Sequence, residues 1–337
     1  MLEKVAIRVG VLGAGSWGTT LAILLHRNGH QVTLWEFRPE VAKEIARRRE
    51  VYEFVPGVRL PDGLSVTSDL ISTVSGKDMA LIVVPSHILR RAISGVSGES
   101  AGKAVVVTAT KGIEAGTLMR MSEVIAQQWQ IDMDRIAVLS GPSLSKEVLK
   151  GIPTTVVAAS QNLDTAKWTQ KVFASPLFRV YASDDIVGVE LGGALKNVMA
   201  IAAGIADGLG FGDNSKGALM TRGLSEMARL GIRMGGRPLT FAGLSGMGDL
   251  ITTCVSPLSR NHTVGYRLGK GEKLQDILQS MNMVAEGVNT TKAALELAHK
   301  YGFEMPIVEA VYSILFEGKS PKTAVVELMT RELKVED

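Results

Sequence analysis

The feature that most constrains the fold is a glycine-rich turn between an apolar run and a helical pattern. Ile7 to Leu12 is mostly apolar, Gly13, Gly15 and Gly18 follow it, and the apolar residues after Gly18 recur at helical spacing. This order predicts a buried strand, a tight turn and a helix. In such a turn the first glycine permits the bend, the second admits a pyrophosphate to the backbone, and the third lets the helix pack on the strand. Because the helix N-terminus also offers unpaired N–H groups to anionic oxygens, the motif favours a dinucleotide site.

A second predicted strand bears on which dinucleotide binds. Gln31 to Trp35 predicts this strand, and Glu36 follows it about 20 residues beyond the glycine turn, where a carboxylate accepts hydrogen bonds from the adenosine ribose. Glu36 therefore favours NAD, whereas the nearby Arg38 could pair with the 2′-phosphate of NADP. Each residue has an ordinary alternative, a solvated charge at the end of a strand. The sequence leaves the choice between NAD and NADP open.

Strands and helices alternate along the first half of the chain. Further buried strands are predicted at residues 79–84, 104–110, 136–140, 154–159 and 178–181, with helices at 39–49 and 163–173 and a loop at 51–64. This alternation predicts an α/β domain with a Rossmann-type, doubly wound parallel sheet over residues 1–183. No strand is predicted after that, and residues 186–209 and 216–231 have helical patterns. An all-α domain is therefore expected over residues 184–337.

Composition argues against several classes of function. The net charge is only +3, and the one basic block, Arg47 to Arg49, fits the solvated face of a helix, so no nucleic-acid partner is expected. The single cysteine, Cys254, cannot form a disulfide within the chain, which favours a cytoplasmic location. The five histidines lack ligand-like spacing with Cys, Asp or Glu, so no metal is expected.

No segment is expected to enter a membrane. Met1 to Lys4 leads directly into the first strand without the pattern of a signal peptide. The apolar stretches are interrupted by charge, Gly or Asn too often to span a bilayer. We therefore expect a soluble protein whose ligands are small molecules.

Several polar residues stand where a ligand of this fold would bind. His87 and Lys111 follow predicted strands, at the carboxyl edge of the sheet. His87 more simply begins a helix without a chemical role. Lys196 lies in a run of small apolar residues, where burial would lower its pKa and make it a proton acceptor near neutral pH. The alternative is a lysine whose stem extends to water.

The second half of the chain also contains a polar cluster. Asp249 stands on a glycine-flanked turn, and Ser259, Arg260 and Asn261 follow as a hydroxyl, a guanidinium and an amide in succession. Such a group suits a phosphate because the guanidinium gives paired charge-assisted hydrogen bonds and the other two add donors. A polar loop between helices is the alternative.

Taken in order, these segments resemble the NAD(P)-dependent glycerol-3-phosphate dehydrogenases of bacterial type. The resemblance covers nearly the whole chain and includes Gly13-x-Gly15-Ser16-Trp17-Gly18-Thr19, Thr110–Glu114, Ser140–Ser143, Glu190–Asn197, Gly246–Leu250, Ser259–Asn261 and Glu286–Gly287. The glycine turn is common to many dehydrogenases. The Lys-Asn pair followed by Gly-Asp-Leu and Ser-Arg-Asn is specific.

The resemblance implies reversible hydride transfer between NAD(P)H and dihydroxyacetone phosphate, giving sn-glycerol 3-phosphate for phospholipid synthesis. It implies that Lys196 is the general acid and base at the C2 oxygen, that Lys111 assists, and that Asp249 holds and tunes the site. The implied substrate-binding residues are Lys111, Gly141, Ser143, Lys196, Asn197, Asp249, Ser259, Arg260 and Asn261. With the glycine turn and the end of the second strand included, the candidate cofactor-binding residues are Gly13, Gly15, Ser16, Trp17, Gly18, Glu36, Phe37, Arg38, Lys111, Ser145, Arg260, Val284 and Glu286.

The chain departs from the family pattern at the cofactor. Ser145 stands where bacterial members often have alanine, and they often carry basic or His residues around positions 37 and 38. The Glu36-Phe37 pair therefore does not indicate which cofactor is preferred.

Two other functions fit the same architecture. A two-domain dehydrogenase for a hydroxy acid or sugar derivative would not need a phosphate site at Ser259 to Asn261. A nicotinamide-sensing protein without turnover would not need a proton donor at Lys196. For any of these a homodimer is the default expectation.

Overall fold

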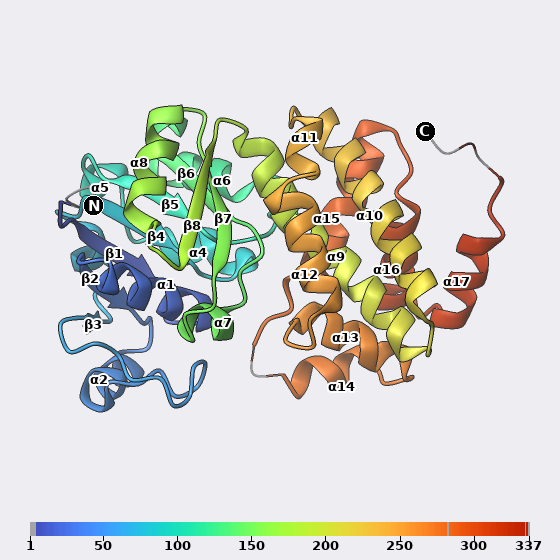
Figure 1. Cartoon of the computed structure of the whole chain (residues 1–337), viewed down its shortest axis with the longest axis horizontal. Coiled ribbons are helices and arrows are strands. Elements are labelled where there is room, and N and C mark those ends of the chain that lie inside the picture. Colours follow the sequence, from blue (N-terminus) through green and yellow to red (C-terminus); the bar gives the residue numbers. More distant parts are fainter. Residues whose placement is uncertain (1–4, 282, 334, 336–337) are drawn as a thin grey trace.

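The computed structural model describes residues 5–281, 283–333 and 335, which form a sheet domain and a helical domain side by side (Figure 1). Residues 1–4, and with them the predicted path into the first strand, lie outside the described residues. The strands are β1 (Arg8–Leu12), β2 (Gln31–Trp35), β3 (Ser65–Thr67), β4 (Met79–Ile82), β5 (Val105–Thr108), β6 (Ile136–Ser140), β7 (Thr154–Ala159) and β8 (Phe178–Ser183).

Short helices connect these strands and cover both faces of the sheet. They are α1 (Ser16–Arg27), α2 (Pro39–Arg48), α3 (Leu70–Val74), α4 (Leu89–Ile93), α5 (Gly98–Ala101), α6 (Met121–Trp129), α7 (Ser145–Leu149) and α8 (Leu163–Phe173), with 3-10 turns η1 (Ser86–Ile88) and η2 (Met133–Arg135). Separate apolar clusters are packed around the sheet, one of them including Val9, Leu21 and Leu34 and another including Leu12, Ile82 and Val124. The predicted α/β class is confirmed.

The sheet has eight strands in the order β3-β2-β1-β4-β5-β6-β7-β8. All neighbours are parallel except β6 and β7, so the predicted doubly wound parallel sheet is confirmed apart from one antiparallel pair. The connection explains the reversal. A helix of five residues, α7, rises only about 7.5 Å. It is too short to return the chain along a six-residue strand of about 20 Å, so β7 starts at the edge where β6 ends.

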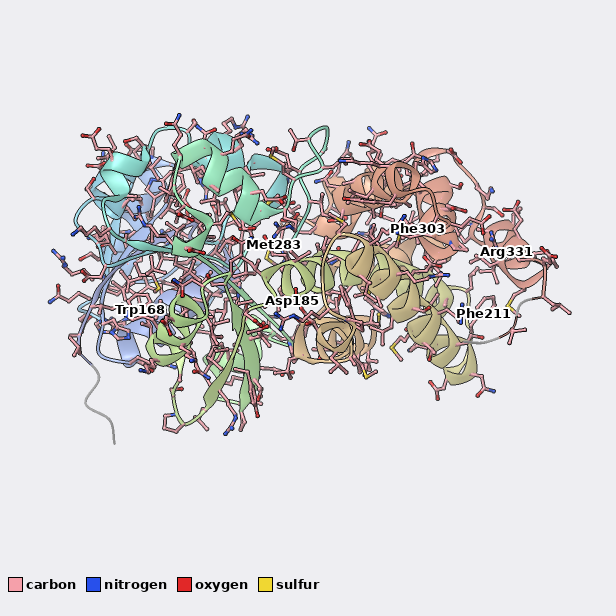
Figure 2. The ribbon with its side chains drawn as sticks, turned by 90° about the horizontal axis from the view of Figure 1, so that it is seen from above. Trp168, Asp185, Phe211, Met283, Phe303 and Arg331 are labelled. Carbon is pink, nitrogen blue, oxygen red and sulfur yellow. The ribbon has the colours of Figure 1, made fainter. Side chains whose placement is uncertain are left out.

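The helical domain is built around α9 (Ile186–Gly208). Its other elements are α10 (Asp213–Arg233), α11 (Pro238–Phe241), a π-helical turn η3 (Leu244–Gly248), α12 (Asp249–Val255), α13 (Arg260–Gly269), α14 (Leu274–Gln279), α15 (Glu286–Tyr301), α16 (Pro306–Phe316) and α17 (Pro321–Met329). The Asp185 side chain accepts a hydrogen bond of 2.9 Å from the Gly188 amide and so caps α9. From there α9 runs through the helical domain, towards the side where Phe211 lies (Figure 2).

Glycines on both helices bring α9 and α13 unusually close together. A Cβ on Gly204 of α9 would lie 2.1 Å from the His262 carbonyl oxygen, and one on Gly265 of α13 would lie 2.0 Å from that of Ile201. Gly208 and Gly269 repeat this contact one turn further along each helix. The distance between packed helices depends on the side chains at their contact. Because glycine has no side chain, the backbones of α9 and α13 themselves set the distance here.

α9 bears on the expectation that no segment enters a membrane. By length and hydropathy alone it could cross a membrane, although no stretch was predicted to do so. However, 89% of that apolar window is buried inside the fold, as in the central helix of a folded domain.

A buried ion pair joins the two domains. The Arg120 Nη1 at the start of α6 donates to the Glu190 carboxylate of α9 at 2.5 Å. The amide and hydroxyl of Ser122 donate to the same carboxylate at 2.8 and 2.6 Å. Both charged side chains are less than a tenth exposed. Since an unpaired buried charge is costly, this contact fixes the first turns of α9 against the sheet domain.

Candidate active site

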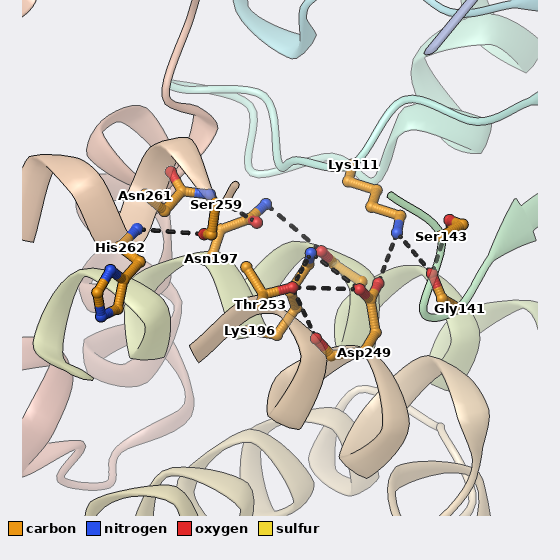
Figure 3. A network of polar contacts seen from close by, with 11 residues as sticks. Lys111, Gly141, Ser143, Lys196, Asn197, Asp249, Thr253, Ser259, Asn261 and His262 are labelled. Atoms are coloured by element: carbon orange, nitrogen blue, oxygen red, sulfur yellow. Dashed lines mark hydrogen bonds and ion pairs between the residues drawn. The ribbon is translucent and has the colours of Figure 1, made fainter. Parts of the chain in front are cut away.

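A buried lysine lies at the centre of the site. Lys196, in the middle of α9, is 7% exposed, so its stem does not extend to water. Its Nζ donates to the Thr253 Oγ1 at 2.6 Å and lies 3.0 Å from the Asp249 Oδ1 (Figure 3). Asp249 and Thr253 lie one turn apart on α12, which places both side chains against α9.

The sheet domain contributes a second lysine. Lys111 follows β5, and its Nζ lies 2.5 Å from the Asp249 Oδ2 and 3.2 Å from the Gly141 carbonyl oxygen (Figure 3). Gly141 follows β6 and also accepts a hydrogen bond of 2.9 Å from the Ser143 hydroxyl. Because the carboxyl ends of parallel strands meet at one edge, Lys111 and Gly141 face the helical domain together. Asp249 therefore lies between a lysine from each domain.

The electrostatics of this cluster follow from its burial. Burial lowers the pKa of Lys196 to about 8. The neighbouring Asp249 carboxylate favours the ammonium form but offsets only part of the effect of burial. Burial opposes the ionisation of Asp249, but the two ammonium groups outweigh it and hold the pKa of that carboxyl below its ordinary value. Lys196 can therefore exist as ammonium or as amine near neutral pH, while Asp249 stays charged.

The polar residues of α13 lie beside this cluster. The buried Asn261 donates through Nδ2 to the Asn197 Oδ1 at 2.8 Å and accepts a hydrogen bond from the Gly287 amide at 2.9 Å. Ser259 is also buried and caps α13 by accepting from the His262 amide at 3.2 Å. Asn197 follows Lys196 directly, so the chain brings Asn261 to the residue next to the buried lysine (Figure 3).

Arg260 occupies a different position from its neighbours. It is exposed, and its Nη1 donates to the Val284 carbonyl oxygen at 2.8 Å. Glu286, at the start of α15, reaches the sheet domain, where its carboxylate accepts from the amide of Ser86 at 3.0 Å and from the Ser86 hydroxyl. Among the predicted cofactor positions, Glu286 thus lies between the domains, and Arg260 and Val284 lie beside it. His87, next to Ser86, is exposed on η1 and has no described contact with these three residues.

The glycine turn fits a pyrophosphate. Gly13 has φ +119°, and a Cβ there would lie 2.6 Å from the Val83 carbonyl oxygen. A Cβ on Gly18 would lie 1.9 Å from the Gly13 oxygen, whereas one on Gly15 would meet nothing within 4 Å. Gly13 therefore permits the turn, and Gly18 permits the packing of α1 on β1. Open space lies over Gly15, in front of the α1 N-terminus.

The remaining cofactor candidates lie around this turn. The Ser16 hydroxyl donates to the Phe54 carbonyl oxygen at 2.8 Å, which joins the turn to the loop after α2. Trp17 is half-buried against the sheet core, and Ser145 begins α7 without a described contact to the turn. At the end of β2, Phe37 is 65% exposed.

Comparisons with known proteins agree with this geometry. Residues 8–166 match the family described as NAD-dependent glycerol-3-phosphate dehydrogenase N-terminus, and residues 185–326 match its C-terminus. The chain belongs to the NAD-dependent glycerol-3-phosphate dehydrogenase family. It is 51% identical over 329 residues to glycerol-3-phosphate dehydrogenase (NAD(P)+) of Prosthecochloris aestuarii, covering 97% of this chain and 99% of that protein. It is 52% identical over 330 residues to the protein of that name from Geobacter sulfurreducens, covering 98% of each.

A solved structure of the family has the same fold. The crystal structure of glycerol-3-phosphate dehydrogenase from Coxiella burnetii superposes with a TM-score of 0.92 at 38% identity, covering 97% of this chain and 99% of that chain. The predicted resemblance and the predicted two-part architecture, a Rossmann-type sheet followed by helices, are confirmed. As a member of this family the chain is an NAD(P)-dependent oxidoreductase. Among the described residues no group of three or more His, Cys, Asp or Glu side chains could hold a metal.

Two contacts of this site were not predicted from the sequence. Thr253 contacts Lys196, and the only signal for it is its position four residues after Asp249, the spacing of one helical turn. Ser86 contacts Glu286 from 200 residues away, and nothing in the sequence pairs them. Both contacts depend on how distant segments pack.

Proposed function

We propose that this protein catalyses the reversible reduction of dihydroxyacetone phosphate to sn-glycerol 3-phosphate, with Lys196 as the proton donor and acceptor. One observation carries the proposal. The ammonium of Lys196 is buried in the helical domain, 3.0 Å from a carboxylate that Lys111 of the sheet domain also contacts. The family of the chain supplies the substrate class and the cofactor.

The proton is supplied by this chain. When bound, NAD(P)H supplies a hydride to the ketone carbon. The oxygen on that carbon then develops negative charge, which the Lys196 ammonium stabilises before it transfers its proton. Asp249 and Thr253 hold the lysine in place, since the Thr253 hydroxyl donates to the Asp249 carbonyl oxygen at 2.6 Å and so turns a lone pair to Nζ. Lys111 adds a second positive charge from the opposite side of Asp249.

The substrate phosphate is proposed to bind at the start of α13. Ser259, Arg260 and Asn261 offer a hydroxyl, a guanidinium and an amide there, and Asn197 connects this group to Lys196. Gly141 and Ser143 complete the substrate-binding set from the sheet edge. Binding the distant phosphate orients the ketone, so that this binding energy contributes to the rate of the chemical step.

The cofactor is proposed to lie along the carboxyl edge of the sheet. Its pyrophosphate would occupy the open space over Gly15, and its adenosine end would meet the residues at the end of β2. The remaining candidates complete the proposed cofactor-binding set; they are Gly13, Ser16, Trp17, Gly18, Glu36, Phe37, Arg38, Lys111, Ser145, Arg260, Val284 and Glu286.

The biological setting is part of the proposal. We assign the cofactor domain to residues 1–183 and the substrate domain to residues 184–337. We propose a cytoplasmic homodimer whose product feeds glycerophospholipid synthesis. The only cysteine, Cys254, is buried and free, which is consistent with a reducing compartment. Light scattering coupled to size-exclusion chromatography measures the oligomeric state.

The decisive experiment compares Lys196→Met with a matched control. Lys196→Met should lower kcat for reduction of dihydroxyacetone phosphate at least about a thousandfold, while NADH still binds. The control is Lys77→Met, a half-buried lysine at the amino end of β4 whose Nζ donates to Thr33 at 3.2 Å, and it should leave kcat within twofold. An active Lys196→Met variant contradicts the mechanism. If the wild type oxidises an unphosphorylated hydroxy acid in preference to sn-glycerol 3-phosphate, it is a dehydrogenase of the hydroxy-acid class instead. If it binds NADH without any turnover, it is a nicotinamide sensor.

The pH dependence is a second test of the same lysine. Reduction requires the ammonium form, so kcat/KM for reduction should fall as the pH rises through about 8. Oxidation of sn-glycerol 3-phosphate requires the neutral amine, so its kcat/KM should rise over the same interval. Parallel profiles in both directions would contradict the assignment.

A further inference from the structure

The guanidinium of Arg38 is held between two carboxylates at the end of β2. Its Nε donates to the Glu36 Oε1 at 2.8 Å. Its Nη1 and Nη2 donate to the two oxygens of Glu53 at 3.1 and 2.7 Å, which is the paired geometry of an arginine with a carboxylate. Three of the five N–H groups of the guanidinium are therefore used within the chain.

Glu53 is a fixed residue despite its place in a loop. Its neighbours Val51 and Val55 are 2% and 5% exposed and belong to the sheet core. The carbonyl oxygen of the next residue, Phe54, accepts the hydrogen bond from Ser16 in the glycine turn. The loop is thus packed on the core and tied to the turn, so Glu53 approaches Arg38 in a defined geometry.

This arrangement bears on cofactor choice. In the proposed binding mode the adenosine ribose lies at the end of β2, where a carboxylate accepts from ribose hydroxyls and an arginine pairs with a 2′-phosphate. Two carboxylates around one guanidinium leave a net charge of −1, which repels a 2′-phosphate. Both contacts from Arg38 to Glu36 go to Oε1, and the Glu36 side chain is only 4% exposed. A phosphate would have to break the paired contact to Glu53 before Arg38 could bind it.

We propose that Glu53 is a specificity-determining residue, which makes the enzyme prefer NADH to NADPH by keeping Arg38 from the 2′-phosphate. This inference rests on the proposed function for its cofactor. It adds a residue from the loop after α2, which no glycine motif or strand end indicates.

The test measures binding directly. The dissociation constants of NADH and NADPH are measured by fluorescence titration for the wild type and for Glu53→Gln, with ADP and adenosine 2′,5′-bisphosphate as probes of the adenosine end alone. The wild type should bind NADH at least tenfold more tightly than NADPH. Glu53→Gln removes the charge and keeps the shape, so it should improve NADPH binding at least tenfold and change NADH binding less than threefold.

Two further variants separate the mechanism from a general charge effect. Glu50→Gln removes a charge from the same loop, but the Glu50 carboxylate accepts from the Gly57 amide rather than from Arg38, so it should leave both dissociation constants within twofold. Arg38→Met combined with Glu53→Gln should abolish the gain, because the gain depends on a freed guanidinium.

Several outcomes overturn the inference. They are a wild type that prefers NADPH, a Glu53→Gln variant whose ratio of dissociation constants stays within twofold of the wild type, and a gain that persists without Arg38. A wild type that binds NADH as expected but does not reduce dihydroxyacetone phosphate refutes the proposed function instead, and the binding ratios still decide the role of Glu53.

Discussion

Replacing Asp249 by asparagine tests the charge balance of the site most sharply. Asp249 is 2% exposed and lies 3.0 Å from the Nζ of Lys196 and 2.5 Å from that of Lys111. The asparagine has nearly the same size, so it removes one negative charge and leaves the packing unchanged. Two ammonium groups would then share a buried space without a counter-ion, and the protonated form of Lys196 becomes less stable.

The magnitude follows from the geometry. Two unit charges about 4 Å apart interact by about 4 kcal/mol at an effective dielectric constant of about 20. Since about 1.4 kcal/mol corresponds to one pKa unit, removing the carboxylate should lower the pKa of Lys196 by roughly three. That pKa is about 8 in the wild type. In Asp249→Asn, kcat/KM for reduction should therefore begin to fall at about pH 5.

The assay is the pH profile of kcat/KM for reduction of dihydroxyacetone phosphate, measured from pH 4.5 to pH 10. Thr253→Val is the control, because it removes the other partner of Lys196 without changing any charge. A single neutral hydrogen bond is worth about 1 kcal/mol, so this control should move the profile by less than about one pH unit. If Asp249→Asn and Thr253→Val move the profile equally little, the carboxylate does not set the charge of the lysine and the electrostatic reasoning is wrong.

Two other predictions concern the fold that supports this site. Gly18→Ala places a Cβ 1.9 Å from the Gly13 carbonyl oxygen and should destabilise the protein by roughly 1–3 kcal/mol, seen as a lower melting temperature. In Gly15→Ala the added Cβ meets no atom within 4 Å, so the melting temperature should not change, but the NADH dissociation constant should rise at least tenfold. Equal melting temperatures for the two variants would contradict this contrast. Arg120→Met leaves the buried Glu190 without its charged partner and should lower the free energy of unfolding in urea by about 3–5 kcal/mol. The double variant Arg120→Met with Glu190→Leu should recover most of this loss. A single variant as stable as the wild type would argue against a buried domain contact.

Local patterns predicted most of the elements well. The bounds of β2, β6, β7 and α8 agree with the sequence prediction because each is an apolar run or helical repeat bounded by turn or capping residues. The antiparallel pairing of β6 and β7 was not predicted, because strand direction depends on the length of the connection between strands and not on the apolar pattern within them. The short β3 lies beyond the predicted loop at 51–64 and gives too few residues for a pattern.

The site was predicted as a set of residues and not as an arrangement. The sequence left open whether Lys196 is buried, because a helix is buried on all its faces only when other elements pack around it. Its contact with Thr253, and the pairing of Arg38 with Glu53, join residues whose spacing carries no periodic signal. The sequence therefore indicated which residues could take part in the chemistry, whereas the contacts that they make depend on the fold.

The glycines shared by α9 and α13 have a consequence for the substrates that the enzyme can accept. Lys196 is on one of these helices and the residues proposed to bind the phosphate begin the other. Because no residue is smaller than glycine, substitution at Gly204 or Gly265 can only push the two helices apart. Substitution at these two glycines can therefore lengthen the span between the Lys196 amine and the proposed phosphate site but cannot shorten it. Variants selected at these positions should adapt to larger phosphorylated ketones more readily than to smaller ones.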